Sequence, residues 1–254
     1  MSSAVATTGN NGILWSSIKS KIKGVGDYFW IKLNNVNVKC RVAGRNIYKN
    51  CGDTIVLGDH YVIVTDTHFQ EAAYYPANDT SGGTKSSGNT STKQAFLGSD
   101  IWNLTLGANP STGAAVTTTG INQTLYSIFG SALLKYRDMS SNAINKTAIS
   151  CAGNGLTGCS SNFEFHECYA TLLSECEVYG CTISGSSVYD IGIKKAQLPL
   201  FTLNPELIIN TSMYYWLKDV TSNTSFCRCG ATGAAHNRAA SAPSGLRLEF
   251  LLNI

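Results

Sequence analysis

The sequence predicts an α+β fold in which mixed antiparallel sheets, two helices and long irregular loops follow a short N-terminal helix. Runs rich in β-branched and aromatic residues lie near both ends of the chain, at 27–42 and 246–252. Two central segments, 101–106 and 121–129, space their apolar residues as helices do. Hydrophobic residues form 43% of the 254 residues, which is enough to bury a core.

The short N-terminal helix is expected at 13–23. Leu14, Ile18 and Ile22 recur at i, i+4 and i+8 with lysines opposite, which predicts about three amphipathic turns. An isolated helix this short is marginal in water, so we expect it to pack on its own domain, on sister subunits or on the remainder of a particle. A basic membrane-surface helix is the alternative, which its length and single Trp support poorly.

The chain is expected to divide at residue 25. Residues 1–12 are rich in Ser, Thr, Asn and Gly, which predicts flexibility, and they lack the charged start and apolar core of a signal peptide. We therefore expect release by assembly or lysis if the protein acts outside a cell. Segment 1–25 is predicted to serve attachment or oligomerisation, and segment 26–254 to be the ligand-binding domain.

The first strands follow directly. Segment 27–42 is predicted to form a hairpin around Asn34 and Asn35, because Asn tolerates the positive φ that tight turns require. Segment 54–67 continues as a strand rich in β-branched and aromatic residues. The domain is thus expected to begin as sheet.

The middle of the chain is predicted to hold a surface loop and two helices. Segment 78–93 has few apolar residues and is predicted to be the loop. Ser99 and Asp100 offer a helix N-cap before the apolar residues of 101–106. The second helix, 121–129, is expected to close at Gly130.

An acidic stretch, 163–180, follows a predicted strand at 133–136 and a tight loop at 153–158. His, Cys and Glu are all zinc ligands, but their spacing in the acidic stretch matches no established structural zinc pattern. We expect Glu175 to be a structural hydrogen-bonding residue instead. The acidic stretch contains Glu164, His166, Glu167, Cys168, Glu175 and Glu177.

Nine cysteines are many for such a chain, and their number is odd. A secreted disulfide scaffold is usually shorter and has an even number. We therefore interpret most of the cysteines as small buried hydrophobic residues. Cys151 and Cys159 flank a Gly-rich loop and are the one pairing considered.

The C-terminal stretch is expected to carry the function. Aromatic residues at 214–217 and alternating apolar residues at 246–252 predict scaffold strands. Between them, 225–244 shows neither helical nor strand periodicity, which predicts an exposed loop or short hairpin. A solvated loop without a role is the alternative.

Several motifs together resemble C-type-lectin-like domains of the formylglycine-generating-enzyme (sulfatase-modifying-factor) type, which occur in phage and gut-bacterial proteins. The C-terminal signature is carried by Tyr-Trp-Leu-Lys-Asp-Val at 215–220, Ser-Phe-Cys at 225–227 and Gly-Leu-Arg-Leu-Glu-Phe-Leu-Leu at 245–252. Further matches lie at 129–145, 172–180 and 197–208. The resemblance covers the chain from about residue 28 onward.

This resemblance implies a recognition function. In some members, the loop before the final strand is varied by a diversity-generating retroelement, and residues 227–241 lie at that place. The expected function is that of a phage receptor-binding or surface-display protein, located on the virion or alternatively on a bacterial cell surface. Expected partners are a host-surface protein or glycan, other virion proteins and sister copies in a homo-oligomer, with a trimer plausible. The expected ligand-binding residues are Tyr214, Cys227, Arg228, Cys229, Thr232, His236, Asn237, Arg238 and Ser241. Tyr215 and Trp216 are further candidate aromatic anchors, although Trp216 is expected more as a core residue.

Other functional classes have less support in the sequence. Cys227 and Cys229 near His236 would suggest a thiol nucleophile with a base, but the family's catalytic cysteine pair has no matched positions here. No GxSxG elbow and no Gly-rich phosphate loop after a strand occur. The calcium motifs EPN and WND of lectins are also missing, so we expect calcium-independent binding, no cofactor, no bound metal and no enzymatic activity.

The charge balance and hydropathy bear on partners. A dispersed net charge of +3 does not favour nucleic acid. No stretch approaches the roughly 18–20 apolar residues of a bilayer crossing, so membrane insertion is not expected. The competing class is a structural virion protein, a capsid-decoration or tail component whose lectin-like domain cements its neighbours.

Overall fold

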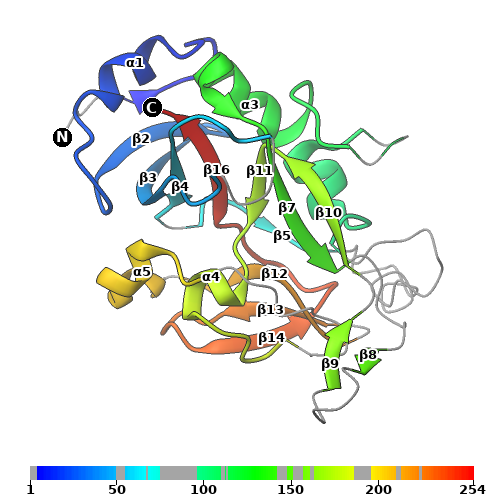
Figure 1. Cartoon of the computed structure of the whole chain (residues 1–254). Helices are drawn as coiled ribbons and strands as arrows, with labels where there is room; N and C mark the ends of the chain where they lie inside the picture. Colours follow the sequence, from blue (N-terminus) through cyan, green and yellow to red (C-terminus); the bar gives the residue numbers. More distant parts are fainter. Residues whose placement is uncertain are drawn as a thin grey trace.

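The computed structural model is a mixed α+β fold built mostly of strands with a few helices (Figure 1). Two curled sheets dominate it, the first in the upper half of Figure 1 and the second in the lower half. The structure describes residues 5–49, 55–66, 68–74, 96–109, 112, 114–141, 148–150, 157–160, 163–185, 196–209, 213–222 and 225–254. The predicted loops at 78–93 and 153–158 lie wholly or largely outside these residues, as does Cys151 of the considered Cys151–Cys159 pair.

The first sheet has the strand order β1-β2-β3-β4-β16-β11, with β6 also pairing with β16. Among the described strands of this first sheet, β1 and β2 pair in parallel and all other neighbours pair antiparallel. C-terminal β16 lies between β4 and β11, so the end of the chain completes the sheet that its beginning starts. The strands are β1 (Val5–Ala6), β2 (Tyr28–Leu33), β3 (Val36–Arg45), β4 (His60–Thr65), β6 (Leu133–Leu134), β11 (Ala170–Leu172) and β16 (Leu248–Asn253).

The predicted hairpin at 27–42 is confirmed as β2 and β3. Asn34 and Asn35 form its turn with φ of 46° and 64°. Both values lie in the left-handed region that Asn tolerates better than most residues. The predicted strand within 54–67 is confirmed as β4, all of whose residues are buried.

Two helices cover the upper side of the first sheet (Figure 1). These are α1 (Ile13–Lys19), shorter than predicted, and α3 (Gly120–Phe129), which ends at Gly130 as predicted. Trp15 of α1 packs against Phe29 and Phe129 with ring centroids 5.5 and 6.0 Å away.

The packing of α1 bears on the predicted division at residue 25. Trp15, Ile18 and Ile22 belong to the same core as the first sheet, and Trp15 Nε1 donates to the carbonyl of Asn253 at 3.1 Å. Ala6 of β1 is also buried in this core. The described part of segment 1–25 therefore packs into the same core as the first sheet, and its role in attachment or oligomerisation stays a prediction.

The second sheet has the strand order β14-β13-β12-β15-β5. Its strands are β5 (Glu71–Ala72), β12 (Tyr215–Ser222), β13 (Ser225–Cys229), β14 (Ala235–Ala239) and β15 (Ser244–Gly245). Strand β14 forms one edge, so the segment predicted to be a loop or short hairpin, 225–244, is a hairpin with one outer strand.

Shorter elements connect and flank the two sheets. The predicted helix at 101–106 is the π-helix η1 (Ile101–Gly107), and the Trp102 backbone N–H donates to the Ser99 hydroxyl. Two antiparallel pairs, β7–β10 and β8–β9, stand apart from the main sheets. The remaining elements are η2 (Gly130–Ala132), β7 (Tyr136–Ser141), β8 (Ala148–Ser150), β9 (Thr157–Ser160), β10 (Phe163–Cys168), α4 (Glu175–Tyr179), α5 (Pro199–Leu203) and η3 (Pro205–Ile208).

Most described cysteines are small core residues, as predicted. Cys40, Cys168, Cys176, Cys227 and Cys229 are buried free thiols, whereas the free thiol of Cys181 is exposed. Burial raises the pKa of the Cys40 thiol well above its ordinary value, with the nearby Asp66 carboxylate adding to the rise. This thiol is therefore held in its neutral form.

Candidate functional site

The predicted recognition segment is a β-hairpin whose strands pair in regular register. Arg228 lies opposite His236, and Phe226 lies opposite Arg238. The connecting turn closes through a bond from the Gly230 N–H to the Ala234 carbonyl at 2.7 Å, and Gly233 has a φ of +86°. A Cβ at position 230 would lie 2.8 Å from the His236 ring, so only glycine lets that ring lie over the turn.

The two faces of this hairpin differ in what they contact. Side chains alternate along a strand, so Arg228 and His236 share one face, while Cys227 and Cys229 share the other. Both cysteines have no exposed surface, and the Cys229 thiol lies 3.7 Å from the Ile208 carbonyl oxygen. The structure thus places both predicted site cysteines in the core beneath the outer face.

The position of Cys229 also bears on the thiol-nucleophile hypothesis. Burial raises the pKa of its thiol, which favours the unreactive protonated form. His236 makes its ring contact with Tyr214 on the opposite face of the sheet instead. The hairpin therefore does not bring the proposed nucleophile and base together.

On the outer face, Tyr214, Arg228 and His236 form a stacked cluster. The Arg228 guanidinium carbon lies 3.9 Å from the centroid of the Tyr214 ring, and the His236 ring meets that ring edge-on at 5.6 Å. Tyr214 and Arg228 are half-buried, whereas His236 is exposed. The tyrosine thus holds the guanidinium in a defined place at the surface.

Positive charge is concentrated at this cluster. Burial, and after it the charge of Arg238, lowers the pKa of the Arg228 guanidinium. The ion pairs found between described residues include neither Arg228 nor Arg238. The Arg228 Nε is buried and donates no hydrogen bond within the described chain. Two cations therefore lie near each other with unused donors.

The other predicted residues frame this cluster with varying exposure. Thr232, Asn237 and Arg238 are exposed, and Ser241 is half-buried. Of the candidate aromatic anchors, Tyr215 and Trp216 are fully buried, and the Trp216 indole donates to the Ala72 carbonyl at 2.7 Å. Of these three candidate anchors, Tyr214 is therefore the one that an external ligand can reach.

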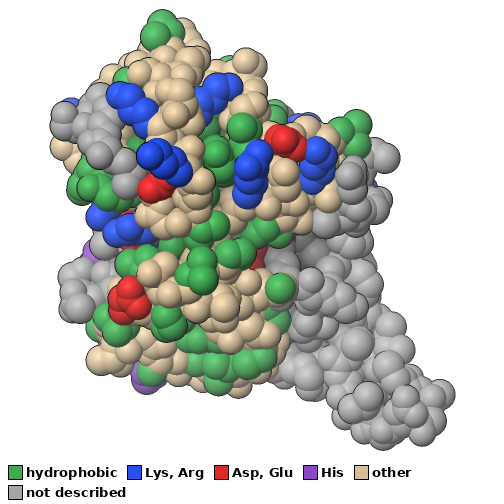
Figure 2. Space-filling view, turned by 60° about the vertical axis from the view of Figure 1, so that its left-hand side comes forward, with side chains coloured by type: hydrophobic (Ala, Val, Ile, Leu, Met, Phe, Trp, Pro, Cys, Tyr) green, Lys and Arg blue, Asp and Glu red, His purple; other side chains and the backbone are tan. Residues whose placement is uncertain are grey.

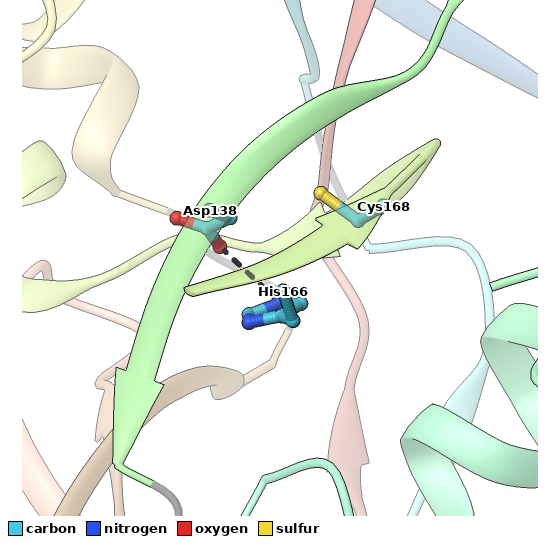
Figure 3. Close-up of side chains that lie close together, drawn as sticks. All are labelled: Asp138, His166 and Cys168. Atoms are coloured by element: carbon cyan, nitrogen blue, oxygen red, sulfur yellow. Dashed lines mark ion pairs between the residues drawn. The ribbon is translucent and has the colours of Figure 1, made fainter. Parts of the chain in front are cut away.

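A second constellation lies in the interior. Asp138 on β7 and His166 and Cys168 on β10 each offer one ligand atom, and these three atoms lie within 4.8 Å of one another (Figure 3). His166 and Asp138 face each other in the strand register, with His166 Nε2 3.9 Å from Asp138 Oδ2. All three residues are buried.

The surroundings of this buried group are partly charged and partly aromatic. Lys218 on β12 donates a short hydrogen bond to Asp138 Oδ2, and its Nζ lies 3.9 Å from Glu177 Oε2. The His166 ring lies edge-on to Trp102 at 5.0 Å and near Phe96 at 6.2 Å. Sequence reasoning missed Asp138 and Lys218, because neither lies near the acidic stretch in the chain.

The acidic stretch itself divides into separate structural roles. Glu175 accepts hydrogen bonds from the backbone N–H groups of Ile183, Ser184 and Gly185, which confirms it as a structural hydrogen-bonding residue. Glu177 completes a capping box with Ser174 at the start of α4. Glu167 pairs with Lys135 at the surface at 2.8 Å, and the side chain of Glu164 lies outside the described residues.

Comparisons of the chain with protein-family models, with curated proteins and with solved structures gave no match. Among the described residues, no helix combines the length and apolar character that a membrane crossing requires. The case for a function therefore depends on the geometry of the two sites.

Proposed function

We propose that the protein is a ligand-binding protein whose outer β12–β14 face recognises an anionic group on a host-surface ligand. The observation that supports this is the pair Arg228 and Arg238, two neighbouring guanidinium groups with no carboxylate partner among the described residues. Like charges held together are unfavourable without a counter-ion. A carboxylate, sulfate or phosphate group on the ligand would supply it and accept several hydrogen bonds at once.

The proposed binding mode combines Arg228, which is held in place, with side chains of the edge strand β14, which can be substituted. Stacking on Tyr214 restrains Arg228 before the ligand arrives, which lowers the entropy lost on binding. His236 and Arg238 project from the edge strand β14, where substitutions leave the core untouched. No calcium ion is required, because the arginines already provide the positive charge.

We further propose that the domain is C-type-lectin-like and serves as a phage receptor-binding or surface-display protein, as its motifs imply. If a diversity-generating retroelement varies 227–241, burial sets which positions tolerate the variation. Positions 228, 232 and 236–238 face solvent at least in part, whereas Cys227, Cys229 and Ala240 are buried. Variation is expected to concentrate at the former set, which deep sequencing of the gene across its source population would measure.

The decisive experiment is binding of the labelled protein to host bacteria, counted by flow cytometry. The triple variant Arg228→Ala, His236→Ala, Arg238→Ala is expected to lose at least about tenfold in affinity, since each contact to an anion contributes about a kcal/mol or more. The double variant Lys21→Ala, Lys23→Ala also removes two positive charges from exposed positions, but on the α1 side, and serves as the matched control. Equal binding by the triple variant and the wild type would show that the site lies elsewhere.

A structural virion role is the second candidate, and the apolar surface around α5 and η3 favours it. Leu203 is 66% exposed and Ile209 is 41% exposed. In Figure 2, Lys and Arg side chains lie mainly over the upper part of the molecule, and hydrophobic side chains gather over the lower part. A second copy of this chain is the proposed occupant, as a homo-oligomer requires.

Sedimentation of the wild type and of a Leu203→Glu, Ile209→Glu variant tests this second candidate. Dissociation of an oligomer by the two glutamates is the expected result, because burying an unpaired charge at an interface is unfavourable. If the wild-type chain sediments as a monomer at high concentration, the apolar surface at Leu203 and Ile209 no longer supports a structural virion role.

A further inference from the structure

We propose that Asp138, His166 and Cys168 form a buried zinc site that fastens the paired strands β7 and β10 inside the domain. This inference is independent of the proposed ligand site, because none of its residues lies on the β12–β14 outer face. Its basis is the convergence of three different metal-ligating side chains from two strands, with their ligand atoms within 4.8 Å of one another (Figure 3).

The strand register explains why these side chains converge. His166 and Cys168 are two residues apart on β10, so both project from the same face of the strand. Asp138 lies directly opposite His166 on β7, which places its carboxylate on that face as well. The arrangement therefore depends on paired backbone rather than on loops, and paired strands hold ligands more rigidly.

The chemistry of the donor set favours zinc over other biological cations. One sulfur, one imidazole nitrogen and one carboxylate oxygen are the three ligand types that Zn²⁺ accepts, and three protein ligands leave one coordination position open. Calcium and magnesium prefer sets made only of oxygen atoms. Binding would release the thiol proton of Cys168 to solvent, since zinc is bound by the thiolate.

Lys218 is compatible with a metal at this place. It donates to Oδ2 of Asp138, and the same carboxylate has a second oxygen, Oδ1, with which to bind a cation. Carboxylates that bind metals are commonly held by a hydrogen bond of this kind. With zinc bound, the charges of Asp138 and the Cys168 thiolate balance the metal, and Glu177, 3.9 Å from Lys218, balances the ammonium.

The competing reading is a metal-free ion pair, in which Lys218 alone neutralises Asp138 and Cys168 remains a buried thiol. The two readings differ in the role of Cys168. In the metal-free reading its sulfur is a neutral thiol, whereas the zinc reading requires a thiolate bound to the metal. A measurement that reports on a metal–sulfur bond therefore separates the two.

The test uses the full chain, freed of metal by a chelator and titrated with Zn²⁺ and with Co²⁺ as a spectroscopic substitute. We expect about one equivalent of metal per chain and a thiolate-to-cobalt charge-transfer band in the near ultraviolet. The variants Cys168→Ser and His166→Gln are expected to lose the band and to bind zinc at least about tenfold more weakly. Cys181→Ser, which removes the exposed free thiol, is the matched control and is expected to behave as the wild type.

The test does not depend on whether Cys168→Ser folds, because the titration of the wild-type chain alone shows whether a thiolate binds the metal. A wild-type chain that binds no Co²⁺, or binds it without a charge-transfer band, overturns the proposal in favour of the metal-free ion pair. Equal zinc affinity of Cys168→Ser and Cys181→Ser also overturns it. A rise in the melting temperature of the wild type on adding Zn²⁺, absent in His166→Gln, supports it.

Discussion

Two arginines in different regions of the molecule each lie over a tyrosine ring, but the protein uses them in opposite ways. In the interior, Arg247 lies 5.1 Å from the Tyr215 ring and donates to the carbonyls of Thr65 and Leu207, both at 2.8 Å. On the outer β12–β14 face, Arg228 lies on the Tyr214 ring, and its buried Nε donates no hydrogen bond within the described chain.

Two histidines, the interior His60 and the outer His236, also differ in whether their polar atoms are used within the protein. His60 is buried at the start of β4, where its Nδ1 lies 3.1 Å from the Gly58 carbonyl and its Nε2 accepts from the Tyr48 N–H at 3.2 Å. His236 is exposed, meets the Tyr214 ring edge-on and lies over the turn at Gly230. In the interior the polar atoms hold the fold together, while on the outer face they are available to a ligand.

This contrast shows how a structural arginine can be told from a binding one. A cation that donates to backbone carbonyls, as Nε and Nη1 of Arg247 do although its buried Nη2 has no hydrogen-bond partner among the described residues, contributes to stability. A cation held in place by a ring, with its donors unused and another cation beside it, is prepared to receive an anion. The contrast leads to four predictions.

The largest effect is expected at the interior arginine. Arg247→Leu should lower the free energy of unfolding by about 3–5 kcal/mol, because two hydrogen bonds from a charged donor are each worth about 1.5–3 kcal/mol. Urea unfolding measures this loss, and Arg238→Leu, an exposed arginine, is the control. A loss below about 1 kcal/mol would mean that Arg247 does not have the structural role assigned here.

The next effect concerns the outer arginine. Arg228→Lys keeps the charge but loses the flat guanidinium that stacks on Tyr214 and forms paired hydrogen bonds. We expect about a tenfold loss of affinity for the host surface, equivalent to about 1.4 kcal/mol, with unfolding unchanged. Affinity retained by the lysine variant would indicate that only the charge is recognised.

A smaller, pH-dependent effect is expected from the interior histidine. Burial lowers the pKa of His60 below its ordinary value, and its Nε2 needs to be unprotonated to accept from the Tyr48 N–H. Its stabilising effect is therefore complete above the ordinary pKa of about 6.5 and is lost as the pH falls through the lowered folded value.

Urea unfolding of the wild type and of His60→Asn at pH 7.5 and 5.5 tests this dependence. The wild type should lose more stability on acidification than the variant, with a slope below the limit of about 1.4 kcal/mol per pH unit for one proton. His236→Asn is the matched control on the outer face, and it should keep the wild-type dependence. Identical pH dependence in His60→Asn and the wild type would contradict the assignment.

The smallest effect is expected at the exposed edge strand. Asn237→Ser should change the free energy of unfolding by no more than about 0.5 kcal/mol, because this side chain lies on the surface of β14. Its partner across the strands, Cys227, is buried, and Cys227→Ser should cost at least about 1 kcal/mol more. Thermal unfolding of both variants compares the stability cost at two positions that the sequence alone assigns to the same exposed segment.

The sequence by itself determined the local elements. Residue pattern was enough for the Asn34–Asn35 turn, for β4, for α3 with its end at Gly130 and for the strands that flank the C-terminal hairpin. Each depends on side-chain spacing or on the φ preference of one or two neighbouring residues, which the chain displays directly.

Only the tertiary structure decided which side chains face a ligand and which belong to the core. It placed Cys227 and Cys229 inside and Arg228 outside on the same strand, and it joined Asp138 to His166 through a strand pairing that local pattern does not encode. It also placed α1 in the core, because Trp15 finds Phe29 and Phe129 only once the sheet has formed. Contacts between distant segments depend on how elements pack, and spacing along the chain does not carry that information.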